Sequence, residues 1–180
     1  MFGDVTWVDL FDVVRAIVIV AVIVLYLAMT AGRLDRLHIA VDAARASLEL
    51  QLALRAEAVA KMMSEGNLDP VSQQLLASAV AARRQRTDES INLAAESEIS
   101  ALLREVVDAH DGVVAGTELQ DELRSACNRV EFAQRIHSDA VGAAQRVRDR
   151  WLVKYLGLAG RTAYPLPLQF DVQAPEFADS

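Results

Sequence analysis

The first apolar block of the sequence is long enough to cross a membrane. Residues 16–32, AIVIVAVIVLYLAMTAG, contain no charged side chain, and the apolar run extends back to Val13 around Arg15. At about 1.5 Å of rise per residue, such a helix nearly spans a hydrocarbon core of about 30 Å, and Arg15 reaches the headgroups. A cleaved signal peptide would need a basic segment before the apolar core, whereas this flank is acidic. The pattern predicts a short flank over 1–12 and a transmembrane helix over 13–32.

Positive charges beside this span predict its orientation. Only one basic residue precedes the apolar core, whereas Arg33, Arg36 and Arg45 follow it closely. Because cytoplasmic flanks of membrane helices are enriched in Lys and Arg, the N-terminus is expected outside and the remaining chain inside the cytoplasm. The residues expected to form the membrane anchor are Arg15, Ile17, Val20, Ile23 and Tyr26.

Beyond the span, apolar positions continue at helical spacing. Residues 34 to 48 carry an apolar side chain every three or four positions, so the membrane helix is expected to run on into the body. The following segment, SLELQLAL at 47–54, alternates like a strand. At 100° per residue, however, Leu48 and Leu52 share one helix face while Leu50 and Leu54 share the opposite one. We therefore expect a helix that is contacted on two sides, with homo-oligomerisation through 48–60 as one consequence.

Start and stop signals predict two further helices in the middle of the chain. Asp69 can cap exposed backbone N–H groups, and Pro70 fits the first turn of the helix that follows. This helix should reach the polar patch ARRQRTDES at 82–90, which is either a break or a solvated kink. The apolar positions of the next helix are Ala95, Ile99, Leu102 and Val106, and the Asp-Gly pair at 111–112 ends it.

The last predicted helix has the longest apolar seam. Thr117 and Gln120 form a capping-box pattern at its start. Spacings of four and three then place one set of residues on a coiled-coil-like seam for packing or interaction. The members singled out for this seam are Leu119, Leu123, Val130, Ala133, His137, Ala140, Val147 and Trp151.

These elements predict an all-α protein. Its N-terminal transmembrane helix should continue into an antiparallel bundle of three to four helices over 33–160. Residues 161–180 hold three of the four prolines and should form an extended tail that packs along the bundle or captures a partner. Just before it, the basic segment around Trp151 either lies against acidic lipid headgroups or is a solvated helix end.

Composition narrows the possible functions. The net charge of the 180 residues is −7, which argues against nucleic acid as a partner. The single Cys127 has no second thiol for a disulfide or a metal cluster, and should be a small buried residue. His137 is the only polar member of the seam, and its neighbours three or four residues away carry no usual metal ligand. We expect it to pack between helices.

One enzymatic pattern gives an alternative hypothesis. Glu96 with REVVD at 104–108 partly matches the Nudix hydrolase box, whose acidic side chains hold a divalent metal for pyrophosphate cleavage. Three box positions differ: Ser90 and Asp111 replace glycines, and Ala109 replaces a metal-binding glutamate. A hydrolase using Glu96, Glu105 and Asp108 is therefore the alternative, and we assign no catalytic, metal-binding or cofactor-binding residue and no cofactor.

The segment 118–141, ELQDELRSACNRVEFAQRIHSDAV, resembles the last-helix signature of the bacterial LemA family. That signature is Asn-Arg-Ile/Val, then Phe-Ala-Arg, an aromatic residue and Asn-Asp-Ala-Val. His137 stands where the family often has Tyr, Ser138 replaces the Asn, and 33–52 is similar to the family's first soluble segment. The matching residues are Asn128, Arg129, Val130, Phe132, Ala133, Asp139, Ala140 and Val141.

The resemblance implies a single-span protein of the bacterial plasma membrane with a helical-bundle body in the cytoplasm. The family has no established catalytic residues, so the resemblance assigns none here. We therefore expect a membrane-anchored, non-enzymatic interaction or scaffold protein whose partners are the membrane, into which it is integral, and other proteins.

Overall fold

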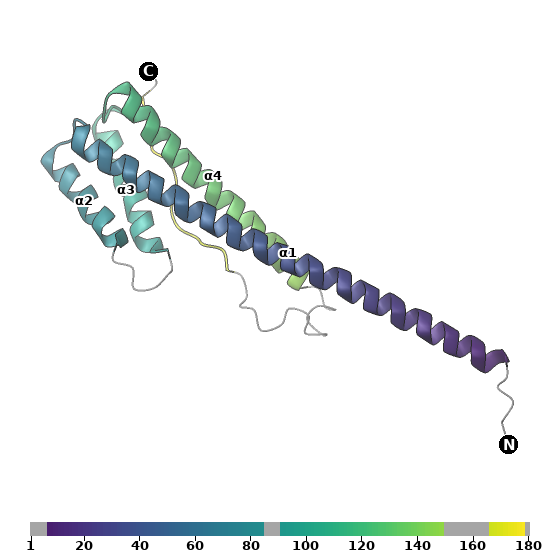
Figure 1. Ribbon diagram of the computed structural model, residues 1–180. Coiled ribbons are helices and arrows are strands. Elements are labelled where there is room, and N and C mark those ends of the chain that lie inside the picture. Colours follow the sequence, from purple (N-terminus) through teal and green to yellow (C-terminus); the bar gives the residue numbers. More distant parts are fainter. Residues whose placement is uncertain (1–6, 85–90, 150–165, 179–180) are drawn as a thin grey trace. The chain divides into compact units, whose positions relative to one another are not determined.

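A computed structural model describes residues 7–84, 91–149 and 166–178 (Figure 1). Within these ranges the chain forms helices and no strand, which confirms the predicted all-α fold. The described helices number four, the upper end of the predicted range. They are α1 (Trp7–Glu65), α2 (Pro70–Arg84), α3 (Leu93–Ala109) and α4 (Thr117–Arg148).

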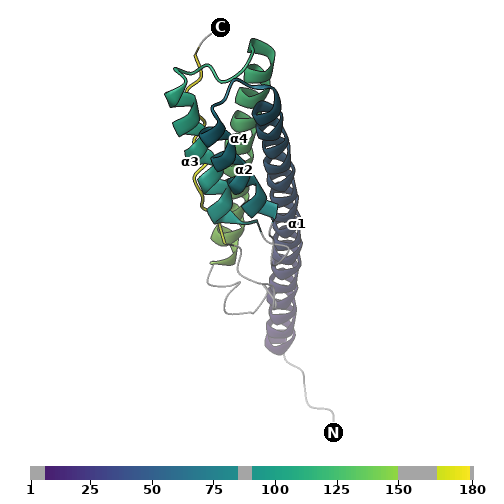
Figure 2. The same ribbon diagram turned by 90° about the vertical axis from the view of Figure 1, so that its left-hand side faces the viewer.

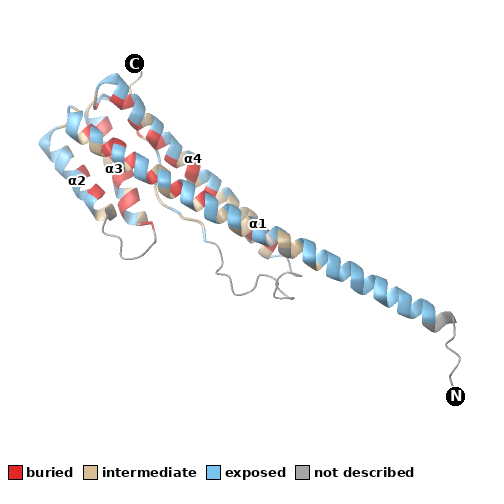
Figure 3. Cartoon of the chain, viewed as in Figure 1, coloured by how far each residue is buried: buried red, intermediate tan, exposed pale blue. Residues whose placement is uncertain are grey.

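Helix α1 contains the apolar segment and continues without a break to Glu65. It begins at Trp7, within the predicted flank 1–12, and contains the whole of the predicted transmembrane segment 13–32. Of the helices described, it alone is long and apolar enough to cross a membrane. Side chains 10–25 on α1 are exposed on every face, as expected of a segment that meets lipid (Figure 3).

The chain divides into two compact units. One comprises 1–39 with 143–165, and the other comprises 40–142 with 166–180. We call the second unit the body. In the body the second half of α1 packs with α2, α3 and most of α4 as an antiparallel bundle, and the buried faces of the helices turn toward one another (Figures 1 and 3).

Two buried apolar clusters form the core of the body. The larger lies where all four helices meet and includes Val59, Leu76, Ile99 and Leu123. The smaller joins α1 to α4 and includes Leu48 and Leu52. These last two residues are the first face of the segment that was predicted to be contacted on two sides.

Local signals explain most helix ends. The Asp69 carboxylate accepts hydrogen bonds from the backbone N–H groups of Val71 (2.8 Å) and Ser72 (3.0 Å), so it caps α2 as predicted. Hydrogen bonding to Ser72 lowers the pKa of this carboxyl below its usual 3.8. Helix α2 is described as far as Arg84 and α3 starts at Leu93, while residues 85–90 of the polar patch, where a break or a solvated kink was expected, lie outside the described residues. Asn92 caps α3 by accepting from the N–H of Ala95.

The turn between α3 and α4 follows one prediction and departs from another. Asp111 (φ 53°) and Gly112 (φ 79°) adopt the left-handed region and end α3 there, as the Asp-Gly pair predicted. The capping box at Thr117 is absent. Helix α4 starts at Thr117 itself, and the Gln120 side chain accepts from the N–H of Val114 instead.

Residues 166–178, the described part of the predicted tail, run along α3 and α4 without helix or strand (Figures 1 and 2). Partly buried apolar side chains of this segment pack against both clusters. They are Leu168, Phe170, Val172, Ala174 and Phe177. Of the two roles considered for the tail, the structure shows packing along the bundle.

Candidate functional site

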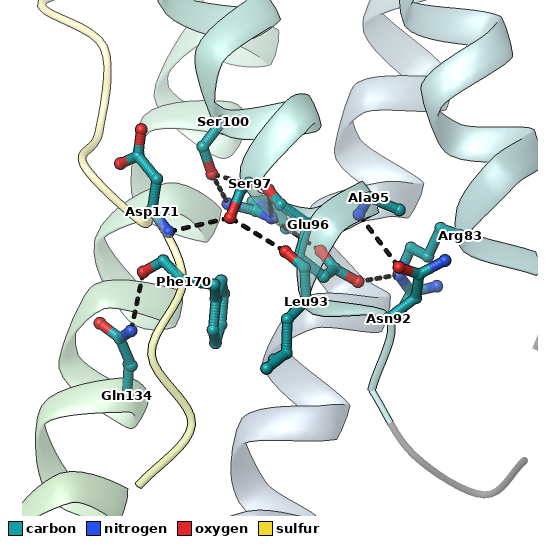
Figure 4. Close-up of polar contacts among 11 residues, drawn as sticks. Arg83, Asn92, Leu93, Ala95, Glu96, Ser97, Ser100, Gln134, Phe170 and Asp171 are labelled. Atoms are coloured by element: carbon teal, nitrogen blue, oxygen red, sulfur yellow. Dashed lines mark hydrogen bonds and ion pairs between the residues drawn. The ribbon is translucent and has the colours of Figure 1, made fainter.

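A buried charged cluster joins α1 to α3 inside the body. Arg55 and Glu96 each expose only 2% of their side chains. The Arg55 guanidinium donates to Glu96 Oε2 over 2.7 Å, to the Glu96 carbonyl over 3.3 Å and to Ser100 Oγ over 2.8 Å. Arg83 at the end of α2 donates from Nε to the other carboxylate oxygen of Glu96 (Figure 4). One buried carboxylate therefore holds two guanidinium groups and ties three helices together.

A small pocket opens beside this cluster at the start of α3. Its lining residues are Glu49, Leu52, Ala53, Arg83, Ile91, Asn92 and Glu96. Glu49 forms an ion pair with Arg45 over 3.2 Å, and Glu96 is bonded to its two arginines. Both carboxylates that line the pocket, Glu49 and Glu96, are thus engaged in ion pairs, which fits a structural role for these residues.

The tail is fixed to α3 by a second ion pair. Arg104 donates through both terminal amino groups to the Asp171 carboxylate and also to the carbonyl of Gln173 over 2.9 Å. The hydrogen bond from Arg104 lowers the pKa of Asp171, and the same bond raises the pKa of Arg104. The backbone N–H of Asp171 donates to Ser97 Oγ over 3.1 Å (Figure 4). Asp171 is therefore held to α3 through both its side chain and its backbone N–H.

Polar contacts also hold the two ends of the tail. Near its start, Gln134 on α4 donates to the carbonyl of Phe170 over 3.0 Å (Figure 4). Near its end, the carbonyl of Ala178 accepts from Arg124 over 2.8 Å and from Gln120 over 3.3 Å. The Arg124 guanidinium also lies 5.6 Å from the centre of the Phe177 ring, within cation–π range.

The seam residues predicted on α4 fall into three groups. Ala140 is half-buried, and Trp151 lies outside the described residues. The buried members are Leu119, Leu123, Val130, Ala133, His137 and Val147.

His137 is 2% exposed, and its Nδ1 atom has no hydrogen-bond partner among the described residues. Burial lowers the pKa of His137, and the charge of Arg45 lowers it further. This histidine is therefore held in its neutral form within the bundle. Cys127 on the same helix is buried too, and burial raises the pKa of its thiol to about 11. At neutral pH this thiol stays protonated and unreactive.

The carboxylates of the Nudix-like pattern are not brought together. Glu96 is buried, whereas Glu105 and Asp108 are exposed. A separation of nine residues turns Glu105 about 180° from Glu96 around α3. Across 7–84, 91–149 and 166–178, no three His, Cys, Asp or Glu side chains lie close enough together to hold a metal ion.

Four large apolar side chains on α1 and α4 are exposed, and we call this set the apolar patch. Its members are exposed in the described chain: Leu50 by 57%, Leu54 by 39%, Phe132 by 63% and Ile136 by 44%. Lys61 and Glu122 link the two helices at 2.7 Å, which raises the pKa of Lys61. Leu54 lies seven residues before Lys61, and Ile136 lies fourteen after Glu122. Seven residues are nearly two helical turns. Leu54 therefore lies on nearly the same side of α1 as Lys61, and Ile136 on nearly the same side of α4 as Glu122.

The predicted anchor side chains lie on the first half of α1. Ile17, Val20, Ile23 and Tyr26 are exposed, as residues that contact lipid would be. Arg15 forms an ion pair with Asp12 over 3.0 Å, one turn earlier on the same helix. This pair lies at the N-terminal end of the apolar segment, where the headgroups of a membrane crossed by α1 would lie.

The sequence analysis missed the Arg55–Glu96 pair and the contacts that Arg104 and Arg124 make with the tail. Arg55 follows Leu48 and Leu52 at helical spacing, so it could have been recognised as a charged residue on a buried face. The partners of Arg104 and Arg124 lie more than fifty residues away in the tail, and no local pattern signals them.

No protein-family model, no curated protein and no solved structure matches the chain.

Proposed function

We propose that this chain is a membrane-anchored, non-enzymatic interaction module. The apolar half of α1 inserts into the membrane, and the body recruits other proteins to the membrane surface. The apolar patch of Leu50, Leu54, Phe132 and Ile136 carries this proposal. Large apolar side chains exposed on two helices that pack together favour a protein partner, since burying them releases ordered water.

The resemblance to the LemA family supports the same proposal. Several residues that carry the resemblance point outward from α4, among them Asn128, Arg129 and Phe132. In this proposal the membrane is the bacterial plasma membrane, with the N-terminus outside and the body in the cytoplasm. The arginine bias after the apolar segment favours that orientation.

Photo-crosslinking tests the role of the patch. A photoreactive amino acid placed at Phe132 or Ile136 in cells should capture a defined protein partner. The matched control is Ala101, which is exposed on α3 away from the patch. Crosslinks of equal pattern at all three positions would refute the proposal.

A substitution pair separates recruitment from stability. Phe132→Asp should abolish the crosslink from position 136 while leaving the fold intact, because the side chain is already exposed. Val113→Asp is the control, since Val113 is an exposed apolar residue outside the patch. Loss of the crosslink in both variants would contradict a role specific to the patch.

Orientation is tested by protease protection of a C-terminal tag in spheroplasts. We expect the tag to survive until the membrane is lysed. Cleavage in intact spheroplasts would place the body on the outer side and would also weaken the LemA interpretation.

The same patch includes Leu50 and Leu54, the second face of the segment expected to be contacted on two sides. A second copy is therefore one partner to test. Sedimentation in detergent should show a mass above that of one chain, and Leu50→Asp should reduce it to one chain. A single-chain mass for the unaltered protein would remove self-association from the proposal.

A further inference from the structure

Charge is distributed unevenly between the two compact units. The body, residues 40–142 with 166–180, contains ten basic and twenty acidic residues, a net charge of −10. In the other unit, the described residues that follow the apolar segment, 33–39 and 143–149, contain four arginines and two aspartates, a net charge of +2. A negatively charged surface therefore repels the body and attracts these two segments.

Two of these arginines lie on α1 directly after the apolar segment. The segment ends at Gly32, and both Arg33 and Arg36 are exposed within about one helical turn of that residue. The Nε of Arg36 donates to the carbonyl of Gly32 over 3.1 Å, which turns this guanidinium back toward the apolar segment. If the segment spans a membrane, both guanidinium groups lie at the level of the lipid headgroups.

The end of α4 brings further arginines to the same level. It belongs to the same compact unit as the first half of α1, and within it Ala144 and Val147 are buried while Arg146 is exposed. Side chains 10–26 of α1 are exposed on every face, so α4 approaches α1 after residue 26. A contact inside the hydrocarbon would place arginine in lipid at a high cost. The end of α4 therefore meets α1 at the headgroup level.

We call Arg33, Arg36, Arg146 and Arg148 the basic end, and we propose that it binds anionic lipid headgroups. Guanidinium groups stay charged and form paired hydrogen bonds with phosphate, so they suit this partner. A zwitterionic headgroup carries its own cation beside the phosphate, and a surface with net positive charge therefore prefers an anionic lipid. The proposal rests on insertion of α1 into a membrane, as proposed above, and it adds the class of lipid that this end recognises.

A second role for the arginines of α4 has to be separated from lipid binding. Arg146 and Arg148 lie in the last turn of the helix, where cations complement the negative partial charge of the helix end. That role stabilises α4 to the same extent beside any lipid. Lipid binding through the basic end instead requires an anionic headgroup, so a comparison of two lipids distinguishes the roles.

Lipid retention by the full-length protein tests the proposal. The protein in detergent is held on an affinity resin and exposed to equal amounts of anionic phosphatidylglycerol and zwitterionic phosphatidylcholine, and the lipids that remain after washing are quantified by mass spectrometry. We expect an excess of the anionic lipid. Each basic residue at a membrane surface contributes about fivefold, so Arg33→Gln and Arg146→Gln should each lower the ratio of anionic to zwitterionic lipid by about that factor. Raising the salt to about 1 M should remove most of the preference.

Two variants serve as controls. Arg146→Lys keeps the positive charge and should keep most of the preference, and Arg129→Gln removes a charge from an exposed position of the body and should leave the ratio unchanged. Equal retention of both lipids by the unaltered protein, or an unchanged ratio in Arg146→Gln, would overturn the proposal. An equal loss in Arg129→Gln would overturn it too. So would displacement of the lipid by inorganic phosphate at matched ionic strength, because the site would then bind a free anion.

Alkaline carbonate extraction of cell membranes separates this proposal from the one on which it rests. We expect the unaltered protein and every variant to stay in the membrane fraction, because the apolar segment of α1 is the same in all of them. Extraction of the unaltered protein would refute both the membrane anchor and this proposal. Retention in the membrane without a lipid preference on the resin would refute this proposal alone.

Discussion

Replacing Glu96 by glutamine should destabilise the body strongly, although the change preserves the shape of the side chain. Glu96 and Arg55 are each 2% exposed, so the carboxylate compensates a guanidinium that has little access to water. Glu96→Gln removes the negative charge and leaves Arg55 buried with neutral acceptors. Breaking a buried pair from one side costs about 3–5 kcal/mol. With a urea dependence of about 2 kcal/mol per molar, the unfolding midpoint should fall by about 2 M.

The double variant Arg55→Met with Glu96→Leu gives the sharper test. It removes both charges together, so neither is left buried alone, and replacement of a buried pair by apolar groups is often close to neutral. The double variant should therefore be more stable than Glu96→Gln. Urea titration of the full chain in detergent, followed by circular dichroism, measures all variants under one condition.

Glu105→Gln is the control for this series, because Glu105 is an exposed glutamate on the same helix. It should stay within about 0.5 kcal/mol of the unaltered protein. The reasoning would be refuted if Glu96→Gln also stayed within that range. It would be refuted as well if the two charge-removing single variants, Arg55→Met and Glu96→Leu, added up to the double variant without coupling.

Three further outcomes are expected. Burial lowers the pKa of His137 below 6.5 in the folded protein, so at lower pH the unfolded chain binds a proton on this residue more readily than the folded protein does. Thermal stability should therefore fall as the pH drops below about 6.5, and His137→Leu should make this fall smaller. Gly112→Ala should release the end of the tail to proteolysis, because its Cβ would lie 2.5 Å from the tail backbone at a φ of 79°, whereas Gly116→Ala enters open space and should not. Asn92→Ala should cost about 1 kcal/mol in urea unfolding through the lost cap of α3, while Asn92→Asp should retain most of it.

Helix positions could be predicted because their signals are local. Asp69 and Pro70 lie within one turn of the backbone groups they affect, and the Asp-Gly turn needs only its own two residues. Hydropathy reports which segment can enter the membrane and leaves the first residue of the helix open, so α1 begins at Trp7, six residues before the predicted span.

Contacts between distant segments could not be predicted in the same way. Gln120 was expected to cap its own helix, but its side chain bonds to Val114 and to Ala178, which is 58 residues away. Which residue faces which across two helices depends on their register, and a single sequence does not contain it. For this reason Arg55 could be suspected of burial from its spacing, while its partner Glu96 was considered only within the alternative, Nudix-like pattern.

The exposed patch also limits the kind of partner that can bind it. Full burial of a large apolar side chain is worth about 1.5–3 kcal/mol, and the four patch residues are about half exposed, so covering them contributes roughly 3–6 kcal/mol. Association of two free proteins costs about 4–15 kcal/mol in lost translation and rotation. The patch alone is therefore marginal for a soluble partner. A partner anchored in the same membrane has already lost much of that freedom, so we expect the proteins captured from Phe132 and Ile136 to be membrane proteins or further copies of this chain.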